Sequence, residues 1–75
     1  MQRELYRELW TLRFQKMLQL EESSVQEYEV LLEEAQKIYE DHTELHNTFR
    51  QLISDEKMHA KLVRELLDIV EQQPD

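Results

Sequence analysis

The feature that most restricts the fold of this chain is its lack of turn-forming residues. It contains no Gly, and its only Pro is Pro74. Strand-rich folds need frequent turns, and Gly and Pro supply the backbone angles that most turn types require. Most other positions hold Leu, Glu, Gln, Lys or Arg, which are strong helix formers. The sequence therefore predicts an all-α fold.

One polar stretch in the middle of the chain interrupts the helical pattern. Asp41 or Thr43 is a candidate N-cap there, and Glu44 follows Asp41 at the capping-box spacing. We predict one helix over residues 2–39 and a second over residues 43–72. Long helices joined by a short connection pack as antiparallel neighbours, so we expect a two-helix hairpin. A single unbroken helix is the alternative, because the connection lacks Gly and Pro.

The length of the chain, 75 residues, allows one domain, residues 1–75. Such a short chain buries little core alone and usually needs disulfides, a metal or a partner subunit. The absence of Cys excludes disulfides and thiolate metal sites. The net charge of −8 disfavours nucleic acid as a partner, which requires clustered Lys and Arg. No apolar run is long enough for a membrane span and no secretory signal is visible, so we expect a cytoplasmic protein.

Apolar residues recur at alternating spacings of four and three in both predicted helices, which is the pattern of a helical-bundle seam. The first stripe comprises Phe14, Leu18, Glu21, Val25, Tyr28, Leu32, Ala35 and Tyr39. The second comprises Leu45, Phe49, Leu52, Glu56, His59, Val63, Leu66 and Val70. Three positions on these stripes hold polar side chains, Glu21, Glu56 and His59.

These three residues indicate a metal site. A carboxylate buried without a partner costs several kcal/mol or more, and neither stripe contains a Lys or Arg. Glu56 and His59 lie one helical turn apart, and Glu21 lies on the facing stripe. A Glu-x-x-His on one helix and a Glu on the next form half the ligand set of a carboxylate-bridged dimetal bundle. Two hairpins related by a two-fold axis supply the full set, so we predict a homodimer that forms a four-helix bundle.

The spacing of these residues resembles that in the ferritin-like superfamily, closest to its rubrerythrin and encapsulated-ferritin branches. Glu21 precedes Tyr28 by seven residues, and Glu56-x-x-His59 is followed by Ala60, as in those families. The resemblance is carried by Leu20-Glu21-Glu22-Ser23-Ser24-Val25-Gln26-Glu27-Tyr28-Glu29 and Asp55-Glu56-Lys57-Met58-His59-Ala60. Two helices per chain, rather than four, resemble the encapsulated ferritins specifically.

The resemblance implies a function and a set of partners. It implies a di-iron ferroxidase site between two subunits, used in iron storage or detoxification, with Glu21, Glu56 and His59 as catalytic metal ligands. Tyr28 is expected to support this site by a hydrogen bond to a ligand or as an electron donor. Encapsulated ferritins form rings of dimers inside encapsulin shells, so the resemblance implies the same assembly and compartment. Manganese or zinc is the alternative metal, because carboxylate and imidazole ligands select weakly among divalent ions.

Several alternatives remain open from the sequence alone. Glu22 is an alternative to Glu21 as the first ligand. His42 and His46 are four residues apart, which is also a spacing for a zinc pair on a helix. A differently phased core stripe would leave Glu56 and His59 on an exposed surface; its members would be Leu52, Ile53, Ala60 and Val63. In that case the chain would be a metal-free helical module that dimerises or acts as an adaptor.

Overall fold

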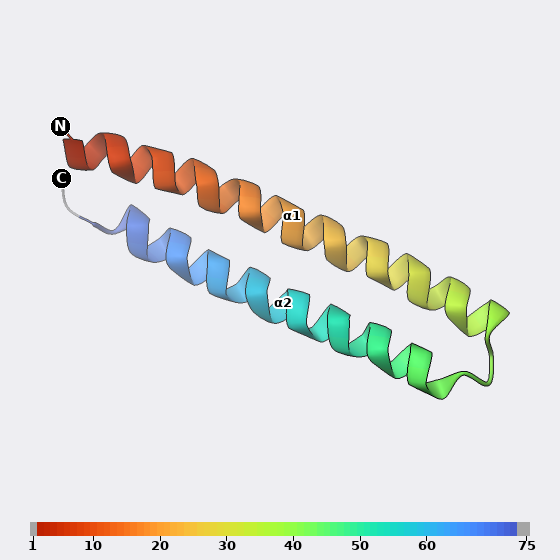
Figure 1. Ribbon diagram of the computed structural model, residues 1–75. Helices are drawn as coiled ribbons and strands as arrows, with labels where there is room; N and C mark the ends of the chain where they lie inside the picture. The colour runs from red at the N-terminus through yellow and green to blue at the C-terminus, as the bar shows by residue number, and fades with distance from the viewer. Residues whose placement is uncertain (1, 74–75) are drawn as a thin grey trace.

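The computed structural model describes residues 2–73, which form an antiparallel pair of helices (Figure 1). Helix α1 runs from Gln2 to Ile38 and helix α2 from Thr43 to Glu71. The predicted all-α hairpin is confirmed, and the single continuous helix is excluded. Each helix ends one residue earlier than the sequence predicted, and no strand occurs among the described residues.

The N-cap of α2 is His42, and not Asp41 or Thr43 as predicted. The His42 backbone is still non-helical, and its ring Nδ1 accepts a hydrogen bond from the backbone N–H of Leu45 at 3.1 Å. This bond satisfies one of the N–H groups that the first turn of a helix leaves without a backbone partner. Thr43 is already the first helical residue, and Asp41 lies one residue too early in the turn.

The inner face of α1 follows the predicted stripe closely. Phe14, Leu18, Val25, Tyr28 and Leu32 are half-buried, and Ala35 is buried. The last predicted member of the stripe, Tyr39, is exposed because it lies in the turn after the helix has ended. The alternating spacing of four and three therefore identified the face of α1 that packs on α2.

The inner face of α2 differs from the predicted stripe. Leu52, His59 and Leu66 are exposed, although all three were placed on the seam. The positions next to them face α1 instead: Ile53 and Ala60 are buried, and Leu67 is half-buried. Ile53 and Ala60 belong to the alternative phasing, whereas Glu56, which that phasing would expose, is half-buried. The predicted stripe is thus divided between the inner face and one flank of α2.

The hairpin is long and thin, and its core is correspondingly small. Its principal extents are 58, 14 and 10 Å, and its radius of gyration is 17.2 Å. A compact domain of this length would have a radius of gyration of about 11 Å. No large side chain among the described residues is completely buried. Neither described helix is long and apolar enough to cross a membrane.

Candidate metal centre

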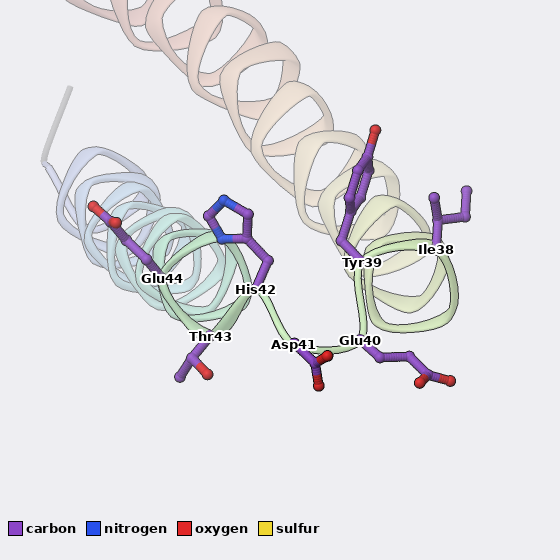
Figure 2. Close-up of a pocket in the computed structure, with 7 residues that line it drawn as sticks. All are labelled: Ile38, Tyr39, Glu40, Asp41, His42, Thr43 and Glu44. Atoms are coloured by element: carbon purple, nitrogen blue, oxygen red, sulfur yellow. The ribbon is translucent and has the colours of Figure 1, made fainter.

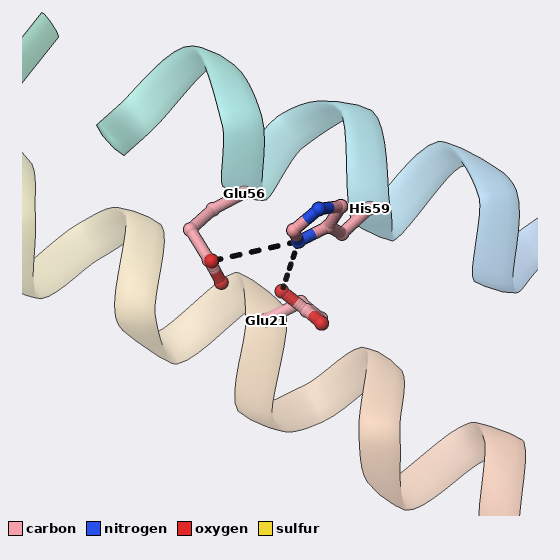
Figure 3. A group of neighbouring side chains, drawn as sticks. All are labelled: Glu21, Glu56 and His59. Carbon is pink, nitrogen blue, oxygen red and sulfur yellow. Dashed lines mark ion pairs between the residues drawn. The ribbon is translucent and has the colours of Figure 1, made fainter. Parts of the chain in front are cut away.

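Glu21, Glu56 and His59 meet near the middle of the hairpin (Figure 3). Glu21 lies close to the midpoint of α1, and the side chains of Glu21 and Glu56 are 20% and 22% exposed. The side chain of His59, one turn beyond Glu56 on α2, is 55% exposed. The cluster is therefore closed by the helices on the carboxylate side and open to solvent on the histidine side.

The three side chains are close enough to share one cation. His59 Nδ1 lies 3.6 Å from Glu56 Oε1 and 3.9 Å from Glu21 Oε2. One candidate ligand atom from each residue lies within 4.8 Å of the other two. Metal–ligand bonds to carboxylate oxygen and imidazole nitrogen are about 2.0–2.2 Å long, so an ion placed between the three atoms needs only small side-chain rotations.

The electrostatics of Glu21 are those of a carboxyl group that lacks a compensating charge. Its Oε2 atom is buried without a hydrogen-bond partner. A side-chain hydrogen bond with Glu56, burial and the negative charge of Glu56 raise the pKa of Glu21, while His59 acts in the opposite direction. Without a cation, Glu21 therefore keeps its proton to a higher pH than an ordinary Glu side chain does. A divalent ion would supply the missing charge and a partner for Glu21 Oε2.

The donor set fits a transition metal better than a hard alkaline-earth ion. Two carboxylates and one imidazole suit iron, manganese or zinc, whereas calcium and magnesium prefer oxygen ligands only. Three protein ligands also leave further coordination positions free for a second ion or a reactant. The arrangement is chemically suited to metal-assisted redox chemistry or to a structural metal.

Two other residues considered from the sequence lie outside this cluster. Glu22 Oε1 accepts a hydrogen bond from Arg64 Nη2 at 2.8 Å, so Glu22 is directed away from Glu56 and His59. This geometry favours Glu21 over Glu22 as the ligand from α1. Tyr28 is half-buried on the inner face of α1, two turns from Glu21, and its supporting role stays a prediction.

The two histidines near the turn do not form a zinc pair. The ring of His42 caps α2, whereas the ring of His46 is buried, with its Nε2 atom 3.2 Å from the backbone oxygen of Ala35. Figure 2 shows His42 among the turn residues 38–44, which line a shallow hollow at this end of the hairpin. The ring of His42 thus stabilises the start of α2, and the ring of His46 connects α2 to the end of α1. No periodic pattern indicated this use of His46, since it lies beside the stripe.

Comparisons with protein-family models, with curated proteins and with solved structures return no match. The case for a function therefore rests on the geometry of the cluster and on the chemistry of its residues.

Proposed function

We propose that this chain binds a carboxylate-bridged pair of metal ions between two copies of itself and acts on Fe(II) as a ferroxidase. The observation that carries the proposal is the cluster of Glu21, Glu56 and His59, with Glu21 Oε2 buried and unpaired. Two such clusters, one from each copy, supply four carboxylates and two imidazoles, the ligand set of dimetal bundles. Four carboxylates also balance the charge of two divalent ions.

In this proposal the protein residues prepare the site and hold it in shape. Glu21 gives up its proton when Fe(II) enters, because its carboxylate then pairs with the cation. Glu56 and His59 are held one turn apart by α2, which fixes their relative positions before the substrate arrives. Two Fe(II) ions held as substrate by Glu21, Glu56 and His59 of the two copies would supply the two electrons that, with two protons from solvent, reduce one O₂ to hydrogen peroxide and leave two Fe(III) ions. Tyr28 would orient a ligand by a hydrogen bond.

An anaerobic Fe(II) titration tests the metal part of the proposal. We expect the wild-type chain to retain about one iron per chain after size exclusion, and Glu56→Ala to retain almost none. Glu22→Ala is the matched control, because it removes a neighbouring carboxylate that pairs with Arg64 instead. Circular dichroism confirms that each variant stays helical. Equal iron retention by the wild type and Glu56→Ala would refute this site.

Oxygen consumption then tests the ferroxidase part. Addition of O₂ to the iron-loaded wild type should oxidise the bound Fe(II) faster than free Fe(II) in the same buffer, and Glu56→Ala should show only the buffer rate. Iron that binds at about one ion per chain but oxidises at the buffer rate would leave a metal-binding protein of another kind. Manganese or zinc would then be the candidate metal.

A second candidate function is a metal-free helical dimerisation or adaptor module. The observation that favours it is the large number of exposed apolar side chains, which include Trp10, Leu31, Ile38 and Ile69. Such a module would be indifferent to Fe(II), and Glu56→Leu would leave it folded or more stable. Membership of the ferritin-like superfamily, a ring of dimers and residence inside an encapsulin shell belong to the first proposal and rest on the resemblance alone.

A further inference from the structure

The two long faces of the hairpin differ in chemistry. On one face, ion pairs cross between the helices: Arg64 Nη2 lies 2.8 Å from Glu22 Oε1, and Lys57 Nζ lies 3.5 Å from Glu29 Oε1. These four side chains are exposed to solvent, so this face of the hairpin is charged. A surface of this kind gains little from being covered, since its charges would lose their hydration.

The other face carries apolar side chains that no part of the described chain covers. Trp10, Met17, Leu31 and Ile38 are exposed on α1 at multiples of seven residues, so they lie in one row. Leu52, Leu66 and the ligand His59 form an equivalent row on α2. The two rows share a face, because Trp10 lines a common hollow with Ile69, which lies one turn beyond Leu66 on α2. We call this surface the apolar face; its members are Trp10, Met17, Leu31, Ile38, Leu52, Leu62, Leu66 and Ile69.

The accessible area of the whole molecule indicates how much surface a partner could cover. The accessible surface is 6190 Å², whereas a compact monomer of 9.3 kDa would expose about 5000 Å². The excess of about 1200 Å² per chain exceeds the roughly 800 Å² that each partner buries in a standard interface. Because the metal cluster opens on this face through His59, a partner here would also cover the site.

A row that contains both apolar and charged side chains borders the apolar face on the outer side of α1. Its members are seven residues apart: Tyr6, Arg13, Leu20, Glu27 and Glu34. Arg13 lies in the first half of the helix, and both carboxylates lie in the second half. In an antiparallel pair of helices, positions of this kind form the interhelical ion pairs that select partner and orientation.

We propose that a second copy of the chain covers the apolar face with the two α1 helices antiparallel, so that Arg13 of each copy lies beside Glu27 and Glu34 of the other. This arrangement rests on the proposed function, because its two-fold axis passes at the level of Glu21. Glu21 lies near the midpoint of α1, so an axis there superimposes nearly the whole length of the two helices. It also brings the two metal clusters together.

The alternative two-fold arrangement, with α1 of one copy over α2 of the other, is disfavoured by charge. Arg13 would then lie over the apolar side chains of Leu66 and Ile69 of the second copy, neither of which can pair with it. Glu27 would lie near Leu52 and Asp55, which places like charges together. Unpaired and repelling charges at an interface cost affinity, so the antiparallel α1 pair is the arrangement that the charges select.

Disulfide trapping tests the arrangement directly, because the chain has no Cys of its own. In the double variant Tyr6→Cys/Ile38→Cys, the two thiols of one chain are separated by roughly 48 Å along α1 and cannot pair. In the antiparallel α1 pair, the thiol at position 6 of one copy lies beside the thiol at position 38 of the other. Mild oxidation of the metal-free protein should give a covalent dimer on a non-reducing gel. A protein that stays monomeric on that gel would overturn the arrangement.

Charge reversal provides the second measurement. Arg13→Glu should raise the dimer dissociation constant about tenfold, because each dimer contains the contact twice. The triple variant Arg13→Glu/Glu27→Arg/Glu34→Arg should restore it. Arg50→Glu is the matched control, because Arg50 lies on α2 outside the apolar face. Equal dissociation constants for the wild type and Arg13→Glu would count against the arrangement.

These results separate the arrangement from the proposed function. A covalent dimer that binds no Fe(II) would support the antiparallel arrangement and refute the metal function. No covalent dimer, together with iron that Glu56→Ala releases, would refute the arrangement and leave the metal function standing.

Discussion

At the scale of single residues, Glu21 is a carboxyl group whose burial is incompletely compensated by hydrogen bonds. It faces Glu56, and its Oε2 atom is buried without a hydrogen-bond partner. A carboxyl group whose pKa is raised on folding holds its proton more tightly in the folded chain. Its contribution to stability is therefore present at low pH and is lost as the pH rises through the folded pKa. In the metal-free protein Glu21 should weaken the fold at neutral pH.

The substitution Glu21→Gln tests this at the level of stability. The amide is neutral and can still donate a hydrogen bond to Glu56, so we expect the free energy of unfolding of the metal-free protein at pH 7 to rise by about 1 kcal/mol. The variant should also lose part of the pH dependence in the acid range. Urea denaturation from pH 4 to pH 8 measures both. Glu22→Gln is the control, and stability curves that run parallel for the wild type and Glu21→Gln would contradict the assignment.

At the scale of the helices, the packing of α2 depends on which of two adjacent rows faces α1. The sequence contains a continuous stripe through Leu52, His59 and Leu66, but the inner positions are taken by Ile53 and Ala60. Ala60 is among the most buried residues described, at 4% exposed. A small side chain at this position lets the two helices approach closely, beside the cluster that Glu56 and Glu21 form.

A matched pair of Val→Ala substitutions tests this packing. Val63 is buried in α2, at 5% exposed, and Val30 lies on the exposed outer side of α1, at 55%. Val63→Ala should lower the free energy of unfolding by about 2 kcal/mol, from the lost burial and the cavity left behind. Val30→Ala should change it by less than about 0.5 kcal/mol. The gain in helix propensity is the same at both sites, so urea denaturation isolates the packing difference. Equal effects would show that the side of α2 that carries Val63 does not pack on α1.

At the scale of the whole molecule, the core of the hairpin is too thin to give a single chain much stability. The hairpin extends 58 Å in one direction and no more than 14 Å in the others, and one of its faces remains apolar. If a second copy covers that face, folding and association are coupled, and stability depends on protein concentration.

The melting temperature of the metal-free protein should therefore rise with concentration. For a dimer of this combined length we expect an increase of roughly 3–6 °C for each tenfold increase in concentration. Leu66→Glu, which places a charge on the apolar face, should lower the melting temperature and remove this dependence. Differential scanning calorimetry at several concentrations measures both. A wild-type melting temperature that does not change with concentration would indicate a monomeric hairpin.

The sequence by itself determined the local features of this protein. The absence of Gly and internal Pro predicted an all-α fold, and the polar stretch in the middle of the chain placed the helix ends to within one residue, because backbone propensity and capping act over neighbouring positions. The spacing of four and three predicted the inner face of α1. The placement of Glu21, Glu56 and His59 on facing helices also followed from helical periodicity, and in the structure the three side chains do meet.

The tertiary structure decided the features that depend on contacts between distant residues. In α2, two rows of similar hydrophobicity compete, and only packing against α1 selected the row with Ile53 and Ala60 over the row with Leu52 and Leu66. Periodicity gives the angle between side chains but not the absolute rotation of the helix about its axis. The same rotation left His59 at the open edge of the cluster, and the pairing of Arg64 with Glu22 directed that carboxylate away from the site. His42 became the N-cap because the turn placed its ring beside the Leu45 N–H group, and the sequence favoured Asp41 or Thr43 instead because His is not a preferred N-cap residue.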